Sequence, residues 1–74
     1  MLVKVFEVEY NWFDRPIKYN FLGEREMKMI PNKGDYLQGK DLWYVEQVTV
    51  VLDVETQNPD NDYAKVYVRK AWKK

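Results

Sequence analysis

The 74-residue sequence contains no cysteine, no histidine and no serine. The missing cysteine excludes disulfides and thiolate zinc sites, and the missing histidine excludes imidazole metal ligands. Neither a Ser–His nor a Cys–His nucleophile pair can form. Two carboxylate pairs, Glu7/Glu9 and Glu24/Glu26, have a same-face spacing, but glycosidase chemistry also requires a deep cleft, which a small β domain rarely offers. We therefore expect a protein that is not an enzyme, with no metal site and no cofactor.

A long apolar segment is also missing. Residues 1–7 lack the basic region and the apolar run of a signal peptide, and no stretch reaches the length of a membrane span. Together with the lack of cysteine, these absences predict a cytoplasmic protein with no membrane partner. The short chain supports one domain, which we place at residues 1–70 as a small β-barrel, followed by a basic C-terminal tail at residues 71–74.

The chain has no excess charge of either sign, because twelve Lys and Arg residues balance twelve Asp and Glu residues. A dedicated nucleic-acid binder usually shows a basic excess. The charges are unevenly placed, however: residues 53–62 contain four acids and no base, and residues 63–74 contain five bases and no acid. We interpret this asymmetry as a solvated acidic turn followed by a basic strand and tail.

Apolar and polar residues alternate with the period of two that half-buried strands show, and no segment has a helical period. The pattern predicts five strands and at most a short helix. We place the strands at residues 2–10, 18–30, 35–38, 42–54 and 63–70. The predicted core consists of Phe6, Val8, Phe21, Met27, Leu37, Val45, Val48, Val50, Val66 and Val68.

Two positions interrupt the alternation. Gly23 is a candidate bulge or bend within the second strand. In the fourth strand the apolar parity switches between Val45 and Val48, so one extra residue, Glu46 or Gln47, is expected to form a bulge. Tight turns are predicted at residues 31–35 and 39–41. Because five short antiparallel strands leave exposed edges, we expect a small five-stranded antiparallel SH3-like barrel or β-roll.

Three segments carry a resemblance to a known group of proteins: Pro31-x-x-Gly34-Asp35-x-Leu37, Trp43-Tyr44-x-x-x-Val48 and Ala64-x-Val66-Tyr67-Val68. This pattern resembles the core of SH3-like barrels. It is most similar to short proteins of bacteria, often Bacteroides-type, and of their phages and prophages. The resemblance implies a small accessory protein, in some cases encoded on a mobile element, and it carries over no functional residue.

Aromatic residues make up 16% of the chain, which is more than one small core should enclose, and the surplus indicates a partner surface. Aromatic residues with arginine nearby are enriched at binding hot spots. For the loop residues Trp12 and Phe13, two interpretations remain open: they cap the barrel, or they bind. The predicted partner-binding residues are Trp12, Phe13, Arg15, Tyr36, Tyr44, Tyr67 and Trp72.

The favoured function is therefore a non-enzymatic module that binds a protein partner or a second copy of itself. The alternative is a nucleic-acid-binding small barrel, since a strand that interleaves aromatic rings with bases can stack single-stranded bases. That face would comprise Lys65, Tyr67, Arg69, Lys70, Lys73 and Lys74. A small-ligand pocket at an oligomer interface ranks third. The Asp60-Asn61-Asp62 segment reads as a polar turn, because it lacks the central glycine and distal glutamate of a calcium loop.

Overall fold

The computed structural model describes residues 1–71. Five strands form one sheet, and a single 3₁₀ turn, η1 (Pro59–Asn61), precedes the last strand. The strands are β1 (Leu2–Tyr10), β2 (Pro16–Glu26), β3 (Tyr36–Gln38), β4 (Leu42–Val51) and β5 (Tyr63–Lys70). The all-β class, the number of strands and the bounds of β1 and β5 agree with the predictions from the sequence.

The sheet has the order β2-β1-β5-β4-β3, and it is mixed rather than antiparallel. The first and last strands lie side by side in parallel, with Val3 opposite Ala64 and Val5 opposite Val66. The other three pairs of neighbours are antiparallel. The expectation of a purely antiparallel sheet is therefore wrong. It rested on hairpins between consecutive strands, whereas β5 returns to the sheet beside β1.

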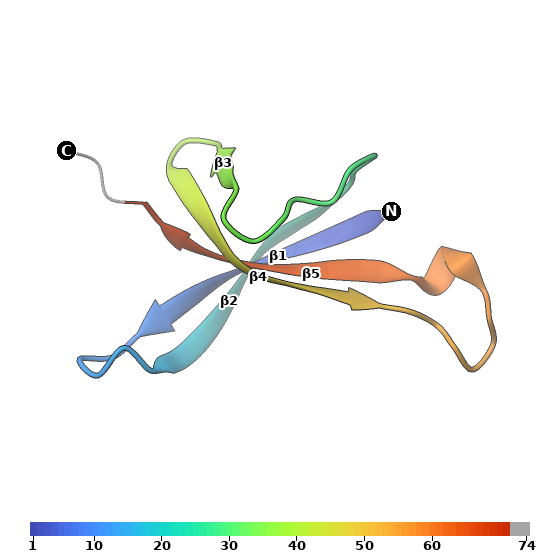
Figure 1. Cartoon of the computed structure of the whole chain (residues 1–74), viewed down its shortest axis with the longest axis horizontal. Coiled ribbons are helices and arrows are strands. Elements are labelled where there is room, and N and C mark those ends of the chain that lie inside the picture. Colours follow the sequence, from blue (N-terminus) through green and yellow to red (C-terminus); the bar gives the residue numbers. More distant parts are fainter. Residues whose placement is uncertain (72–74) are drawn as a thin grey trace.

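The sheet is open, so the predicted closed barrel is not confirmed. Among residues 1–71, β2 pairs only with β1, and β3 pairs only with β4. Figure 1 shows a strongly twisted sheet whose strands fan out from its centre, with the segment after β2 (green) running across to β3. This segment covers one face of the sheet, and β2 and β3 lie at its opposite edges.

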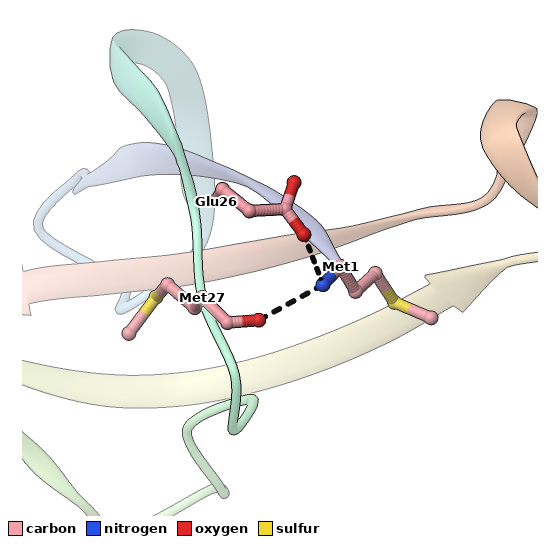
Figure 2. A network of polar contacts seen from close by, with 3 residues as sticks. All are labelled: Met1, Glu26 and Met27. Carbon is pink, nitrogen blue, oxygen red and sulfur yellow. Dashed lines mark hydrogen bonds and ion pairs between the residues drawn. The ribbon is translucent and has the colours of Figure 1, made fainter.

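The crossing segment also explains why β2 ends at Glu26 instead of continuing to residue 30 as predicted. Met27 and Ile30 leave the sheet and pack against its valines, and Pro31 is buried there. In Figure 2 the Met1 ammonium donates to the Met27 carbonyl, at 2.9 Å, and lies beside the Glu26 carboxylate. The Met27 amide donates in return to the Met1 carbonyl. These contacts hold the chain at the point where it leaves β2.

The buried core lies between the sheet and this segment. Its completely buried side chains are Val3, Val45, Ala64, Val66 and Val68. Val8 is also buried, but it lies on the other face of the sheet, opposite Tyr19. Of the predicted core, Val8, Val45, Val66 and Val68 are confirmed, and Met27, Leu37 and Val48 pack against the cluster while partly exposed. Phe6 is only half-buried.

Two predicted core residues are exposed, Phe21 at 56% and Val50 at 47%. Val50 has the expected parity, because it lies opposite Ala64. It is exposed where β4 runs beyond β3 and the turn before it, which cover the outer side of β4 only as far as Val45. Phe21 lies opposite Phe6, on the face of the sheet that no segment covers.

Both predicted bulges are confirmed. In β4, Val45 pairs with Val68 and Gln47 pairs with Tyr67, so Glu46 is the extra residue. The predicted turn at residues 31–35 docks at this position: the Gly34 amide donates to the Val45 carbonyl, and the Val45 amide donates to the Asp35 carbonyl, each at 2.9 Å. In β2 the register shifts beside Gly23, where Leu22 is the extra residue.

The loop between β4 and β5 is organised by Asp53. Its carboxylate accepts hydrogen bonds from the Thr56 hydroxyl and amide and from the Asn61 side chain, while the Asp53 amide donates to Asp62 at 2.7 Å. These donors, the Thr56 hydroxyl above all, lower the pKa of Asp53 from its ordinary value of 3.8 to about 2.

This shift predicts a specific loss of stability in acid. The unfolded chain binds a proton at Asp53 at a higher pH than the folded chain, so stability falls as the pH drops from about 4 towards 2. Thermal unfolding followed between pH 5 and pH 2 should show this decrease. The Asp53→Asn variant should show a weaker dependence on pH in the same window, and equal slopes for the two proteins would contradict the prediction.

Candidate functional site

The register of the sheet assigns each side chain to one of two faces, because residues paired across neighbouring strands point to the same side. The core face carries Val3, Val45 and Val66. The opposite face carries Phe6 and Tyr67, which pair with each other across β1 and β5. The crossing segment covers the core face, whereas on the second face Tyr19 and Phe21 are exposed, Phe6 and Tyr67 are half-buried, and Val8 is buried.

Aromatic side chains from all five strands lie on this second face. The ring centroids of Phe6 and Tyr67 are 5.7 Å apart, those of Phe6 and Phe21 are 5.5 Å apart, and those of Tyr19 and Tyr67 are 5.5 Å apart. Tyr36 and Tyr44 form a further edge-to-face pair at 5.4 Å. We call this surface the aromatic face and define it as Phe6, Tyr19, Phe21, Tyr36, Tyr44 and Tyr67.

A cleft of about 340 Å³ opens within the aromatic face. The parallel pairing of β1 with β5 ends at Glu7 and Val68, and beyond this point the two strands diverge, as Figure 1 shows. The cleft lies beside the end of β1, where Val8 and Tyr10 line it together with residues of β2, β4 and β5. Its lining residues are Val8, Tyr10, Pro16, Tyr19, Lys33, Tyr44, Glu46, Gln47 and Tyr67.

The bulge residue Glu46 is the charged centre of this cleft. Its side chain is 17% exposed, and its carboxylate accepts a hydrogen bond from the Tyr10 hydroxyl. The other carboxylate oxygen lies 3.0 Å from Arg69 Nε, and the Arg69 guanidinium lies over the Tyr44 ring at 5.4 Å. The extra residue in β4 thus turns a carboxylate towards the aromatic face, where it links β1 to β5.

The predicted binding residues divide between two places. The structure brings Tyr36, Tyr44 and Tyr67 together on the aromatic face, as described above. Trp12, Phe13 and Arg15 lie apart from them, in the turn between β1 and β2. Trp72 lies outside the described residues.

The aromatic residues in the turn between β1 and β2 do not pack on the core. Trp12 is 99% exposed and Phe13 is 82% exposed, so neither caps the core. The Asn11 side chain accepts hydrogen bonds from the Phe13 amide, at 2.9 Å, and from the Arg15 amide, at 3.1 Å. These bonds fix a turn that presents two large rings to solvent.

The predicted nucleic-acid face is only partly assembled. Lys65 and Arg69 do lie with Tyr67 on the aromatic face, as the alternation predicted. Lys70 points to the other side, where its ammonium lies 3.7 Å from Asp41 and over the Trp43 ring. Lys73 and Lys74 lie outside the described residues.

The sequence analysis missed Phe6, Tyr19, Phe21, Tyr10 and Glu46 as members of this surface. Phe6 and Phe21 were assigned to the core because each lies on the side of its strand that carries mostly apolar residues. Parity identifies the two faces of one strand, but it does not say which face of that strand continues the core of its neighbour. The apolar character of both faces of β1, with Val3 and Val5 on one side and Phe6 on the other, was the available signal.

Comparisons with protein-family models, with curated proteins and with solved structures found no match to this chain. Within residues 1–71, no helix is long and apolar enough to cross a membrane. The same residues contain no group of three or more acidic side chains placed to hold a metal ion.

Proposed function

We propose that this chain is a non-enzymatic accessory module that binds a protein partner through its aromatic face. The observation that carries the proposal is that five strands place aromatic rings on the same face of the sheet, in one group of four rings and one pair. Tyr36, at 59% exposure, and Tyr19, at 56%, remain accessible although each packs against another ring. Exposed tyrosines beside an arginine, here Arg69 over the Tyr44 ring, have the composition of interface hot spots.

The charges on this face favour a protein partner over a nucleic acid. Arg69 is already paired with Glu46, and Lys70 is paired with Asp41 on the other side of the sheet. A phosphate would have to displace both carboxylates to use these bases. The balanced net charge of the chain also supplies no long-range attraction to a polyanion. The likeness to phage-encoded and other mobile accessory proteins is in keeping with a binding role, and we retain it as part of the proposal.

A single-stranded nucleic acid is the second candidate, and one observation favours it. Lys4 and Lys65 pair across β1 and β5, beside the stacked rings of Phe6 and Tyr67. Two bases next to two stacked rings could hold a phosphate and a base together. Binding of this kind releases counterions, so its affinity should fall steeply with salt.

The decisive experiment compares two surfaces and two ligand classes. Partners captured by the native chain from lysate should be lost or weakened about 30-fold by Tyr44→Ala and Tyr36→Ala, because hot-spot truncation costs about 2 kcal/mol or more. The double variant Trp12→Ala/Phe13→Ala serves as the control for the hairpin turn. Retention of the partner by the tyrosine variants, with loss in the control, would overturn the proposed site.

Titrations with single-stranded oligonucleotides at low and physiological salt address the second candidate. We expect no binding at physiological salt. Salt-dependent binding that is lost in a Lys4→Ala/Lys65→Ala variant would make nucleic acid the ligand of this face instead.

A further inference from the structure

We propose that a second copy of this chain pairs antiparallel with the free edge of β2, which would join two sheets into one. This inference goes beyond the proposed function and concerns the strand edge, which shares Tyr19 and Phe21 with the aromatic face. β2 is eleven residues long, and within residues 1–71 its outer side pairs with nothing. Exposed strand edges with apolar side chains template pairing with another chain.

Four of the six residues from 17 to 22 on this strand have large apolar side chains that are exposed. Ile17 is 63% exposed, Tyr19 and Phe21 are each 56% exposed, and Leu22 is 46% exposed. Tyr19 and Phe21 share one parity and lie on the aromatic face, while Ile17 is the extra residue of a bulge near the start of β2. Pairing along this edge would therefore extend the aromatic face into the second copy.

The local structure restricts the register to one solution. Two register shifts make Leu22, beside Gly23, and Ile17 the extra residues of bulges, so residues 18–21 remain for regular pairing. A two-fold axis at Tyr19 pairs Lys18 with Asn20 of the second copy, whereas an axis at Asn20 would place Lys18 opposite the bulge residue Leu22. An axis at Lys18 would instead place two lysines directly opposite each other, which is unfavourable.

Charge complementarity supports the same register on the core side of the sheet. With the axis at Tyr19, Lys18 lies opposite Asn20 of the second copy. The side-chain amide of Asn20 donates to the Glu9 carboxylate at 2.9 Å, and Asn20 pairs with Glu7 of the neighbouring strand β1. Each Lys18 ammonium would therefore face the carboxylates beside Asn20 of the other copy, and the two-fold axis repeats this attraction.

The other free edge lacks these features. The outer side of β4 is uncovered from Gln47 to Val51, where Val50 is 47% exposed. This segment has no charged residue that could fix a register. β3 presents only three residues. β2 is therefore the edge at which we expect a second copy of this chain to pair.

The experiment is light scattering of the full chain from micromolar to millimolar concentration. An interface made by one strand edge falls below the ~1,200 Å² of standard complexes, so we expect a weak dimer whose mass rises from one chain to two with concentration. Tyr19→Glu and Tyr19→Lys should each remain monomeric, because each places like charges at the axis. Mixing these two variants should restore a dimer through opposite charges across the axis, which no other register predicts.

Val50→Asp is the matched control, since it puts a charge on the free edge of β4 and should leave the dimer intact. Far-ultraviolet circular dichroism verifies that each variant is folded. A native chain that stays monomeric up to millimolar concentration would overturn the proposal. So would a dimer that survives Tyr19→Glu or is lost in Val50→Asp. These outcomes do not depend on Tyr36 and Tyr44, so failure of this proposal is distinguishable from failure of the proposed function.

Discussion

Replacing Val66 with aspartate should leave the protein unfolded at 25 °C. Val66 is completely buried at the centre of the sheet, between Val5 on β1 and Val48 on β4. A carboxyl group there has no described partner and costs several kcal/mol, in addition to the lost packing of the valine. A domain of 74 residues has a total stability of roughly 0.05–0.15 kcal/mol per residue, so this single cost is comparable to all of it. Circular dichroism and urea titration of Val66→Asp against the native chain measure the effect.

Val50→Asp is the control for this prediction. Val50 has the same strand parity as Val48 and lies opposite the buried Ala64, but it is 47% exposed at the free edge of β4. Its carboxylate stays in water, so we expect a loss of about 1 kcal/mol from the lower strand preference of aspartate. Equal losses for Val50→Asp and Val66→Asp would show that the outer side of β4 is covered in solution.

Replacing Gly23 with alanine should destabilise the protein by about 1–3 kcal/mol, which is the usual cost of a strained backbone conformation. Gly23 has a φ of +152°, a conformation that residues with a Cβ rarely adopt. No heavy atom lies within 4 Å of the position that the added Cβ would occupy, so the whole cost comes from the backbone and not from a clash. The midpoint of urea unfolding should therefore fall without a change in slope.

Gly39→Ala provides the matched comparison for Gly23→Ala. The added Cβ would lie 3.9 Å from the Asp41 carbonyl, an ordinary contact, and Gly39 does not have a positive φ. We expect unchanged or slightly increased stability, because alanine reduces the entropy of the unfolded chain. If both variants lose the same stability, the bulge in β2 does not need glycine.

The sequence predicted local features well because they depend on nearby residues. The period of two located β1 and β5, and the parity switch after Val45 located the bulge at Glu46. Turn chemistry located the segment around Gly34, which has a φ of +95°. Each of these features is determined within a few residues of the chain.

The arrangement of the strands could not be predicted in this way. The parallel pairing of Val3 with Ala64 joins residues from the two ends of the described chain, and no local pattern specifies it. The end of β2 was misplaced because Met27 and Ile30 are apolar for a different reason, namely to cover the core from above the sheet. Alternation alone does not separate a strand residue from a covering residue.

The candidate site was predicted residue by residue but not as a surface. Tyr36, Tyr44 and Tyr67 were identified from outward parity, and the structure brings them together. Their neighbours Phe6 and Phe21 were assigned to the interior, because a small domain was expected to use every large apolar residue in one core. The sheet has instead two apolar faces, and only the one that carries the valines is covered.

The position of β5 between β1 and β4 has a consequence for biosynthesis. During translation the β1–β2 hairpin leaves the ribosome first and the β3–β4 hairpin follows, but neither contacts the other until β5 is inserted between them. The nascent chain therefore exposes both hairpins, including the valines of β1, until β5 is synthesised. The joining of β1 to β5 closes a loop of more than 50 residues, which is entropically costly and slow. We expect folding to be limited by the docking of β5 between the two hairpins.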